Sequence, residues 1–439
     1  MSQRRVIVLG GGLAGITTAL DCAEGGAQVT LLEVRPRLGG AAYSFQRDGL
    51  WLDNGQHVFL RCCTAYRTLL ARLGSERCVA IQPRLEIPVL SPGSPVALLR
   101  RSALPAPLHL AGALLGYRHL RLAQRVQAAR AALALGRMDM HAAHGTLGEW
   151  LAAHGQSAAS VAALWDLIVL PTLNLPAAEG SLALGAFVLQ TGLLRHNDAG
   201  DIGFHLRPLS ETLGYPAGRL LCRMGVDVRL GVRVEAVERL PVLADGGCLL
   251  VRAGGEQMEA DTVVCALPHE RARGLLEPLL GQEASRWSGL GASPIVNVHI
   301  VYDRRVCHLP FAASVGTPVQ YVFDRSEAAG LEDGQYLAIS LSGAAEEMEL
   351  SSERLGERYL QAMAELFPRA SEALVRSVHV SREHAATFAA RPGTESLRPG
   401  PRTSVAGLLV AGAWTDTGWP ATLEGAVLSG HAAARGALA

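Results

Sequence analysis

The sequence has little charge, few aromatic side chains and no long apolar run. Of its 439 residues, 18% are charged and 5% are aromatic, and 40 basic residues balance 40 acidic ones. Because the chain has no net charge, it generates no strong field, and we do not expect it to bind nucleic acid. It also lacks a stretch of about eighteen uncharged apolar residues, which argues against a transmembrane helix.

Cysteine occurs eight times but never as a C-x-x-C pair. The scattered thiols fit neither a disulfide framework nor a metal site, so we predict reduced cysteines, no metal and a cytoplasmic location. The hydrophobic fraction is high, at 49%. We therefore expect a surface with more apolar area than usual, which a lipid-like substrate or a membrane-facing patch would explain.

The first forty residues carry the pattern of a nucleotide-binding β-α-β unit. Residues 5–9 (RVIVL) and 28–32 (QVTLL) are typical of strands buried on both faces of a parallel sheet, and residues 16–24 have a helical pattern. A G-x-G-x-x-G turn joins the first strand to the helix, which is the context that makes this motif informative. The residues expected to contact a dinucleotide in this turn are Gly10, Gly12, Leu13, Ala14 and Gly15.

Each glycine of the turn has a physical role. Gly10 permits the tight turn, Gly12 lets the backbone approach a pyrophosphate, and Gly15 allows the helix to pack closely against the strand. Glu33 follows the second strand, where a carboxylate can accept hydrogen bonds from a ribose hydroxyl. Because an acid there disfavours a 2′-phosphate, we do not expect the tightly bound nucleotide to be NADP.

A second glycine pair follows this acid, in the segment RPRLGG at residues 35–40. The segment resembles the second signature of the glutathione-reductase-like flavoproteins, particularly their amine oxidase and phytoene desaturase branch, and this implies FAD. The resemblance extends to Val234, on the strand expected to touch adenine, and to residues 261–268 and 408–412. It implies an α/β fold in which a glutathione-reductase-like FAD-binding Rossmann domain is interleaved with an α+β substrate domain that carries a helical layer.

The chain is expected to alternate between these two domains. FAD-binding segments are predicted at residues 1–82, 201–275 and 391–439, a helical substrate-binding insert at residues 83–200, and the sheet of the substrate domain at residues 276–390. Within them, strand patterns lie at residues 226–237, 262–267, 295–302, 336–340 and 407–412, and a small-residue helix is expected at residues 421–434.

Four separated segments resemble the hydroxysqualene dehydroxylase family, the FAD-dependent, desaturase-like enzymes of bacterial squalene and hopanoid synthesis. They are DNGQHVF at 53–59, PTLN at 171–174, PVQYVFDR at 318–325 and WTDTGWPATLEGA at 414–426. The resemblance implies that the substrate is hydroxysqualene, a long apolar isoprenoid. It also implies that a hydride from reduced FAD replaces the hydroxyl of this substrate to give squalene. NAD(P)H is the candidate external electron donor.

Two positions depart from the wider superfamily pattern. Ala41 stands where an arginine usually follows the second glycine pair, and Ala413 stands where an acid usually follows the late Ala-Gly. Losing such a contact typically costs on the order of 1–3 kcal/mol. The further residues expected at FAD are Arg35, Gly39, Gly40, Ala41, Gly55, Gln56, Gly412, Ala413, Pro420, Ala421 and Thr422. Pro420 and the start of the expected helix at Ala421 and Thr422 are expected to present backbone N–H groups of this helix N-terminus to the flavin or its pyrophosphate.

Removal of an allylic hydroxyl requires a proton donor, because hydroxide is a poor leaving group. His57 and Asp53 are the first candidates, since in similar enzymes their segment runs towards the flavin, and Asp416 is the third. A near-neutral pKa favours His57. The ordinary alternatives are a packing histidine and, for Asp53, a turn residue.

Residues 108–136 combine a long apolar face with Arg118, Arg121, Arg125 and Arg130. This composition suits a helix lying on anionic lipid, and it equally suits ordinary packing against a core. Peripheral contact with the inner face of the membrane is therefore left open.

Three functions follow from these patterns. The first is the dehydroxylase, and the second is a carotenoid (phytoene) desaturase or amine-oxidase-like enzyme that runs the flavin in the oxidative direction. The third is a prenyl-binding protein of the same fold without FAD, as Rab GDP-dissociation inhibitors resemble FAD enzymes. The intact glycine turn and Glu33 count against the third function, because a protein that binds no cofactor needs no pyrophosphate turn.

Overall fold

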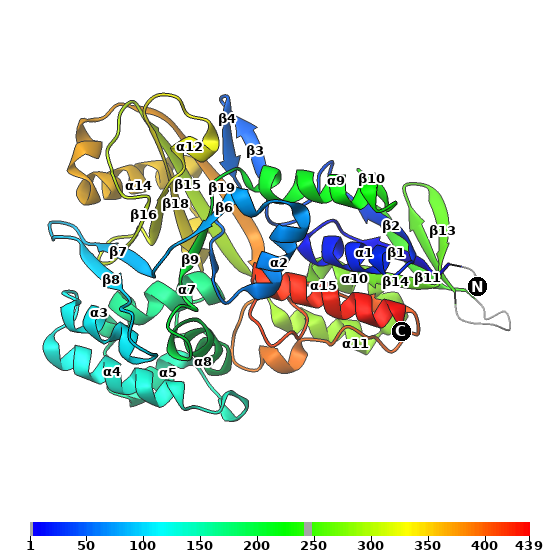
Figure 1. The fold of residues 1–439 in the computed structure, drawn as a ribbon, viewed down its shortest axis with the longest axis horizontal. Coiled ribbons are helices and arrows are strands. Elements are labelled where there is room, and N and C mark those ends of the chain that lie inside the picture. The colour runs from blue at the N-terminus through cyan, green and yellow to red at the C-terminus, as the bar shows by residue number, and fades with distance from the viewer. Residues whose placement is uncertain (1–2, 241–247) are drawn as a thin grey trace.

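The computed structural model of the chain describes residues 3–240 and 248–439, which form three layers of structure. In Figure 1 a parallel sheet with its helices lies on the right, a larger mixed sheet lies at upper left, and a helical layer lies below the mixed sheet. Both ends of the chain lie on the side of the parallel sheet. Among the described residues, no helix is both long and apolar enough to cross a membrane.

The parallel sheet confirms the predicted α/β fold class. Its strand order is β10-β2-β1-β14-β20, and every neighbouring pair is parallel. The strands are β1 (Arg5–Leu9), β2 (Gln28–Glu33), β10 (Asp227–Leu230), β14 (Thr262–Cys265) and β20 (Leu408–Val410).

Strand β1 is apolar throughout because both of its faces are covered. Val6 and Val8 pack into one hydrophobic cluster together with α1 (Leu13–Glu24), whereas Ile7 and Leu9 belong to a second cluster. Side chains of a strand alternate between faces, so each cluster receives every second residue. The run of apolar residues in the sequence is thus explained by a sheet buried on both sides.

The small-residue helix at the end of the chain, α15 (Leu423–Leu438), crosses α1 at very short range. A Cβ added at Gly430 would lie 2.5 Å from the carbonyl oxygen of Ala14, and Thr18 Oγ1 donates to that oxygen at 2.8 Å. The close crossing holds the first turn of α1 in place beneath the glycine turn.

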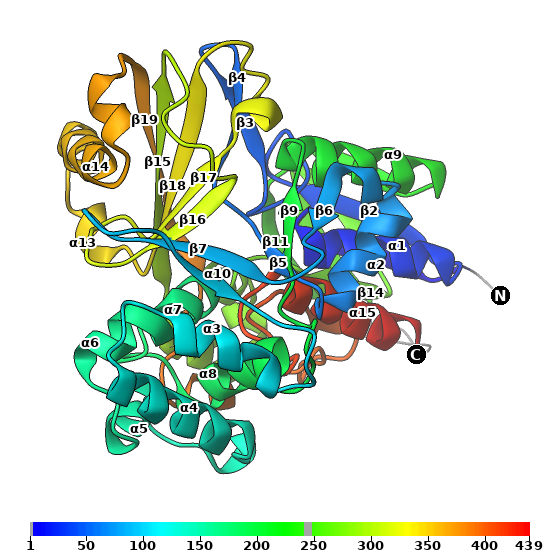
Figure 2. The ribbon, with the colours of Figure 1, turned by 60° about the vertical axis from the view of Figure 1, so that its left-hand side comes forward.

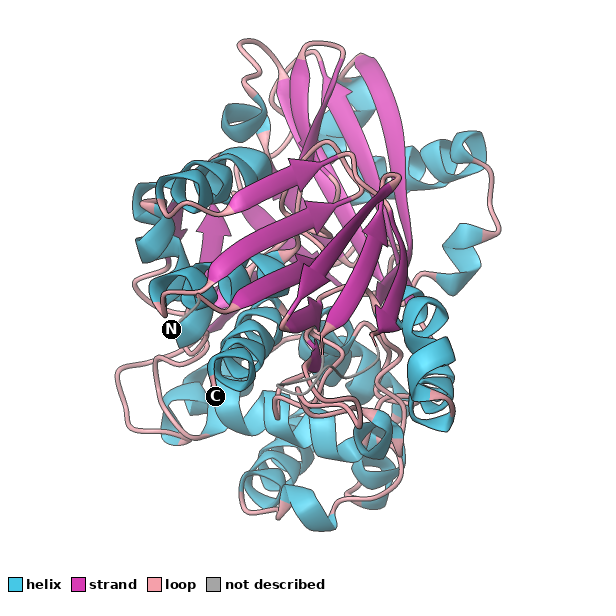
Figure 3. Cartoon of the chain, turned by 90° about the vertical axis from the view of Figure 1, so that its right-hand side faces the viewer, coloured by secondary structure: helices cyan, strands magenta, loops and turns pink. Residues whose placement is uncertain are grey.

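The mixed sheet has seven strands in the order β19-β15-β18-β17-β16-β7-β8 and is seen clearly in Figure 3. Helix α14 (Ser352–Leu366) packs on this sheet through Leu355, Tyr359 and Met363, which share a cluster with Val298 of β15. The strands are β7 (Glu86–Leu90), β8 (Ala97–Arg100), β15 (Ser293–Tyr302), β16 (Phe311–Ser314), β17 (Tyr321–Asp324), β18 (Gln335–Ser342) and β19 (Val375–Thr387).

The predicted helical insert at residues 83–200 is wrong for its first part, because β7 and β8 belong to the mixed sheet. Ile87 and Val89 of β7 alternate into the core, and β7 pairs in parallel with β16. This period-two alternation is short and is followed by a segment rich in proline and serine, so the helical pattern farther along dominated the prediction.

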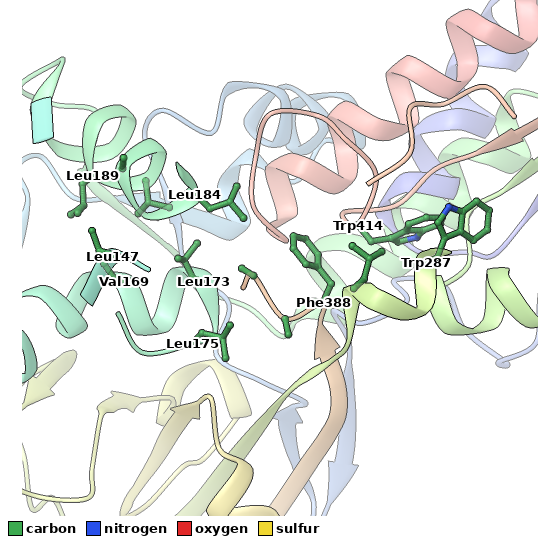
Figure 4. Packing of buried hydrophobic residues seen from close by; sticks show 14 of the residues in the cluster. Leu147, Val169, Leu173, Leu175, Leu184, Leu189, Trp287, Phe388 and Trp414 are labelled. Carbon is green, nitrogen blue, oxygen red and sulfur yellow. The ribbon is translucent and has the colours of Figure 1, made fainter. Parts of the chain in front are cut away.

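Within residues 83–200, the helices begin only after this hairpin, and they form the layer below the mixed sheet (Figure 2). They are α3 (Ala111–Gly116), α4 (Leu122–Gly136), α5 (Leu147–Ala153), α6 (Ala158–Ser160), α7 (Asp166–Leu173) and α8 (Leu182–Leu189), with π-helical turns at residues 161–165 and 190–194. Figure 4 shows that Leu173 and Leu184 of this layer pack towards Phe388. Trp287 and Trp414 belong to the same hydrophobic cluster, on the other side of Phe388.

Residues 226–237 are two strands rather than one, because the chain turns at Gly231, where φ is +75°. Strand β10 joins the parallel sheet, and β11 (Val234–Arg239) joins the antiparallel sheet β11-β12-β13. The remaining strands are β3 (Ser44–Arg47), β4 (Leu50–Asp53), β5 (Phe59–Leu60), β6 (Val79–Ile81), β9 (Ile202–His205), β12 (Leu249–Ala253) and β13 (Glu256–Ala260). The remaining helices are α2 (Thr64–Leu73), α9 (Tyr215–Arg223), α10 (His269–Leu280), α11 (Gln282–Ser285), α12 (Ser326–Ala329) and α13 (Ala345–Met348).

Candidate FAD and substrate site

The glycine turn after β1 has the geometry that its sequence predicts. Gly10 has φ of +107°, and a Cβ at Gly15 would lie 1.9 Å from the carbonyl oxygen of Gly10. A side chain is therefore excluded from Gly15 by contact with backbone. Leu13 and Ala14 lie buried in the first turn of α1, whose N-terminus can bind a phosphate.

The second glycine pair crosses directly over this turn. Gly39 N donates to Gly11 O at 2.9 Å, and a Cβ at Gly40, where φ is +60°, would lie 2.7 Å from Gly12 Cα. Two loops without side chains thus face each other at the N-terminus of α1. This cradle of bare backbone fits a pyrophosphate, which needs N–H groups at close range.

Glu33 lies buried at the end of β2, beside the same loops. Its carboxylate accepts hydrogen bonds from Gly11 N at 2.6 Å and Arg35 N at 2.8 Å, which fixes its orientation. Val232 N donates to the backbone carbonyl oxygen of Glu33 at 3.0 Å. Val234, at the start of β11, follows Val232 by two residues. The structure therefore brings together the residues predicted for the adenosine end of FAD.

Asp53 is held by three donors and ends strand β4. Its carboxylate accepts from Ser44 Oγ at 2.6 Å and Leu209 N at 3.0 Å, and it forms an ion pair with Arg325 at 2.8 Å. These contacts tie the end of β4 to Leu209 and to the mixed sheet and leave the side chain no freedom to turn. We therefore interpret Asp53 as a residue that positions the segment rather than as the proton donor.

His57 lies half-buried four residues farther along. Its Nδ1 is 3.0 Å from Gly55 O, so Nδ1 carries the proton and Nε2 is the nitrogen that can exchange one. Burial lowers the pKa of His57, while the Gly55 carbonyl and then Asp53 raise it. Of the three predicted proton donors, His57 is the one that we retain, because one ring nitrogen is held by the backbone and the other is able to donate a proton.

Polar residues of the mixed sheet face this segment and were missed from the sequence. Asn54 Nδ2 donates to Glu383 Oε1 on β19 at 2.9 Å, and Asn297 Nδ2 on β15 donates to Asn54 O at 2.9 Å. Within the described residues, Asn297 Oδ1 and Gln56 Nε2 are buried without a hydrogen-bond partner. Two orphaned polar atoms beside Gly55 fit a site that a polar ring system completes.

In the loop that follows β20, only some of the residues predicted to contact FAD have the local structure that was expected. Gly412 has φ of +145°, and a Cβ there would meet the Trp414 indole at 2.4 Å. The helix begins at Leu423 and not at Ala421, because Thr422 is the N-cap and its Oγ1 accepts from Gly425 N at 3.2 Å. Pro420 and Ala421 lie before the cap.

Asp416 is an exposed residue of a turn in this loop. Its Oδ1 accepts from Gly418 N at 3.2 Å, and its own N–H donates to Pro399 O at 2.8 Å. The structure therefore does not bring Asp416 into contact with the segment that holds His57.

Two arginines lie beside the positions where the superfamily pattern is broken. Arg37 Nη1 donates to Gly40 O at 3.1 Å, next to Ala41, and its guanidinium stacks 3.4 Å from the Tyr43 ring centroid. The buried Arg398 donates to the carbonyl oxygens of Ala413 at 3.5 Å and of Trp414 at 3.4 Å. It also donates to Thr415 O and Trp419 O, so one side chain holds the whole loop. Arg398 carries no sequence signal because it lies outside the recognisable motifs, whereas Arg37 lies within the RPRLGG segment, in which Arg35 was the arginine predicted at FAD.

The comparisons with known proteins decide which kind of site this is. The sequence profile of flavin containing amine oxidoreductases matches residues 13–438. The chain belongs to this family. The FAD prediction is thereby confirmed, and the bare glycine loops, the buried Glu33 and the orphaned atoms of Gln56 and Asn297 are consistent with it.

Individual relatives in this family act on different substrates. The hydroxysqualene dehydroxylase of Rhodopseudomonas palustris is 28% identical over 98% of both chains. The 15-cis-phytoene desaturase of Narcissus pseudonarcissus is 26% identical over 98% of this chain and 78% of its own. Among solved structures, the cyclohexylamine oxidase of Brevibacterium oxydans covers 99% of both chains at 16% identity with a TM-score of 0.71, which is a likeness of fold.

Replacing Gly40 with alanine is expected to reduce the bound FAD per chain at least tenfold, because the new methyl group would enter the cradle at Gly12. Gly93→Ala is the matched control, since Gly93 has a similar φ of +67° but nothing within 4 Å of the added carbon. The flavin absorbance of the purified proteins measures the difference. Equal occupancy in the two variants would contradict the assignment of the cradle.

Stability is expected to fall as the pH drops from about 6.5, because burial lowers the pKa values of both His205 and His299 to about 3. Below pH 6.5 the unfolded chain binds protons that the folded chain excludes, at up to about 1.4 kcal/mol per pH unit for each histidine. Urea unfolding between pH 7 and pH 4.5 should therefore show a shallower slope for His299→Gln. The exposed His384 provides the control, and an unchanged slope in His299→Gln would refute the effect.

Proposed function

We propose that the protein is a hydroxysqualene dehydroxylase, which converts hydroxysqualene to squalene in squalene and hopanoid synthesis. The observation that carries the proposal is the similarity to the Rhodopseudomonas enzyme over nearly the whole of both chains. A second enzyme of that name, from Sinorhizobium fredii, is 26% identical over 98% of this chain and 97% of its own.

The four segments that resemble this family support the proposal because they contact one another or each other's neighbours. Asp53 of the first segment pairs with Arg325 of the third. Glu424 of the fourth is buried, and its carboxylate accepts from Ala65 N at 2.9 Å and Tyr66 N at 2.7 Å, at the start of the helix that follows the first segment.

The second and third segments meet at a cavity of about 220 Å³. Pro171 lines it from α7, and Gln320 and Tyr321 line it from the third segment. Tyr321 donates from its hydroxyl to Leu167 O at 2.7 Å, which joins the helical layer to the mixed sheet. The lining combines apolar side chains such as Leu167 and Leu170 with polar ones such as Asp166 and Gln320, and its volume would hold only part of a long isoprenoid.

The overall reaction breaks one C–O bond and forms one C–H bond. Reduced FAD supplies a hydride when it is bound, a proton must reach the leaving hydroxyl so that it departs as water, and NAD(P)H is the candidate source of electrons for the next turnover. Protonated His57 would donate from Nε2 while its Nδ1 remains bonded to Gly55 O.

Phytoene desaturation is the second candidate function, and the similarity to the Narcissus enzyme favours it. It runs in the opposite redox direction, since the substrate loses hydrogen and the flavin gains it. A carrier of prenyl groups without FAD is a weaker alternative, because the glycine cradle that FAD requires is intact.

The test is product analysis under anaerobic conditions. Protein with chemically reduced FAD is expected to convert hydroxysqualene to squalene, with one flavin reoxidised per squalene formed. Protein with oxidised FAD and a quinone acceptor should leave phytoene unchanged. Desaturated phytoene, or no squalene from the reduced protein, would overturn the proposed function.

His57→Gln is expected to abolish squalene formation while retaining FAD. In the unchanged protein the single-turnover rate should rise as the pH falls, because the charged imidazole donates the proton and burial lowers the pKa of His57. Asp416→Asn, at an exposed turn, is the control and should retain the rate within about twofold. Normal turnover by His57→Gln would remove His57 as the donor.

A further inference from the structure

The exposed apolar side chains of this protein are concentrated in one part of the chain. Eight of the fifteen large hydrophobic side chains that are exposed in the described residues lie between Val96 and Leu133. They are Val96, Leu98, Leu104, Leu108, Leu115, Leu122, Val126 and Leu133, and we call them the 96–133 surface. Five of them belong to β8, α3 and α4, which lie together at the lower left of the molecule in Figure 1, and the other three lie in the segments next to β8 and α3.

Helix α4 shows why this surface is unusual. Ala128, Ala131 and Leu135 are buried against the rest of the helical layer. At 3.6 residues per turn, Leu122 and Leu133 lie within about 20° of each other and roughly on the opposite side of the helix. A helix that covers a soluble core normally has a polar outer face, whereas these two leucines are 66% and 46% exposed.

The charged residues of this stretch of the sequence have one sign. No aspartate or glutamate occurs between Glu86 and Asp139, whereas seven arginines do, at positions 100, 101, 118, 121, 125, 130 and 137. Arg100 pairs with Glu86 and Arg101 with Asp201. None of the other five takes part in an ion pair within the described residues. Exposed leucines among unpaired arginines are complementary to the anionic headgroups and the acyl region of a bilayer.

A buried tyrosine connects this part of the chain to the helical turn beside the cavity described above. Tyr117, directly after α3, donates from its hydroxyl to Ala163 O at 2.5 Å, and the neighbouring Ala162 lines the cavity. Tyr117 therefore links the end of α3, where Leu115 is exposed, to the turn whose Ala162 lines the cavity.

We propose that the 96–133 surface docks on an anionic lipid bilayer, with Leu115 and Leu122 in the acyl region and Arg118, Arg121 and Arg130 at the headgroups. In this orientation the helical layer that forms one wall of the cavity lies against the bilayer, which would supply the isoprenoid. Only this second step rests on the proposed function, since lipid binding itself does not depend on the substrate.

The experiment is cosedimentation of the full-length protein, loaded with FAD, with vesicles of phosphatidylcholine alone or mixed equally with phosphatidylglycerol. Binding is expected to the mixed vesicles only and to weaken as salt is raised. Arg118→Gln, Arg121→Gln and Arg130→Gln together should lower the partition coefficient about a hundredfold, at about fivefold per arginine. Removing three exposed arginines of another face, Arg207, Arg219 and Arg223, should change it less than threefold.

The apolar contribution is tested by Leu115→Asp with Leu122→Asp, which should reduce binding more than tenfold. Leu374→Asp with Leu230→Asp is the control, because these leucines are also exposed but lie elsewhere. Retained flavin absorbance verifies folding of each variant. Equal binding to both vesicle types, or equal binding by the leucine pairs, would overturn the proposal. So would a dimer in sedimentation velocity without lipid that the first leucine pair abolishes, because the surface would then be a protein interface.

The two proposals fail in different measurements. Lipid binding without squalene formation would leave the docking surface standing and reject the dehydroxylase. Squalene formation in detergent without lipid binding would support the dehydroxylase and reject the docking surface.

Discussion

The ion pair between Asp53 and Arg325 holds together the parts of the chain on which the site depends. Asp53 ends a strand near the cofactor turn, and Arg325 follows a strand of the mixed sheet. Arg325 also donates to the carbonyl oxygen of His205, whose Nδ1 is 2.8 Å from His57 O. Because the carboxylate is nearly excluded from water, removing one partner would leave a buried charge, at a typical cost of about 3–5 kcal/mol. The relative position of the two domains at His57 is therefore set by charge and hydrogen bonds as well as by apolar packing.

Beneath this pair, the mixed sheet presents polar groups where a sheet normally packs apolar ones. His299 contacts the Tyr336 hydroxyl at 2.6 Å and Ser381 Oγ at 3.1 Å, and Ser381 donates in turn to Asn54 O at 3.2 Å. Such a network keeps its shape only when every member finds a partner. The network supports the segment from Asn54 to His57 from one side and fixes its position. A site that holds a reacting ring needs such fixed support.

The sequence alone could predict the parts of the structure whose cause is local. The glycine turn and Glu33 depend on neighbours within one β-α-β unit, so strand, turn, helix and acid all follow from pattern. The start of α15 was misplaced by two residues because Thr422 is the N-cap of the helix and not a residue of its first turn. Glu383 and Asn297 were missed because a single polar residue in a strand looks like an outward-facing position, and only the topology shows that it faces Asn54. The division of the chain into five segments remains a prediction, apart from the hairpin at residues 86–100.

Arg398 has a consequence for how the cofactor is acquired. Its guanidinium binds carbonyl oxygens on both sides of the turn at Asp416, so the loop from Ala413 to Trp419 is ordered by folding itself. Fixing a residue's backbone costs roughly 1–2 kcal/mol, and here that cost falls on the folding of the chain instead of on binding. A ligand that meets a preorganised loop retains more of its contact energy as affinity. The preordered loop would therefore compensate for the acid that the superfamily pattern has at the position of Ala413.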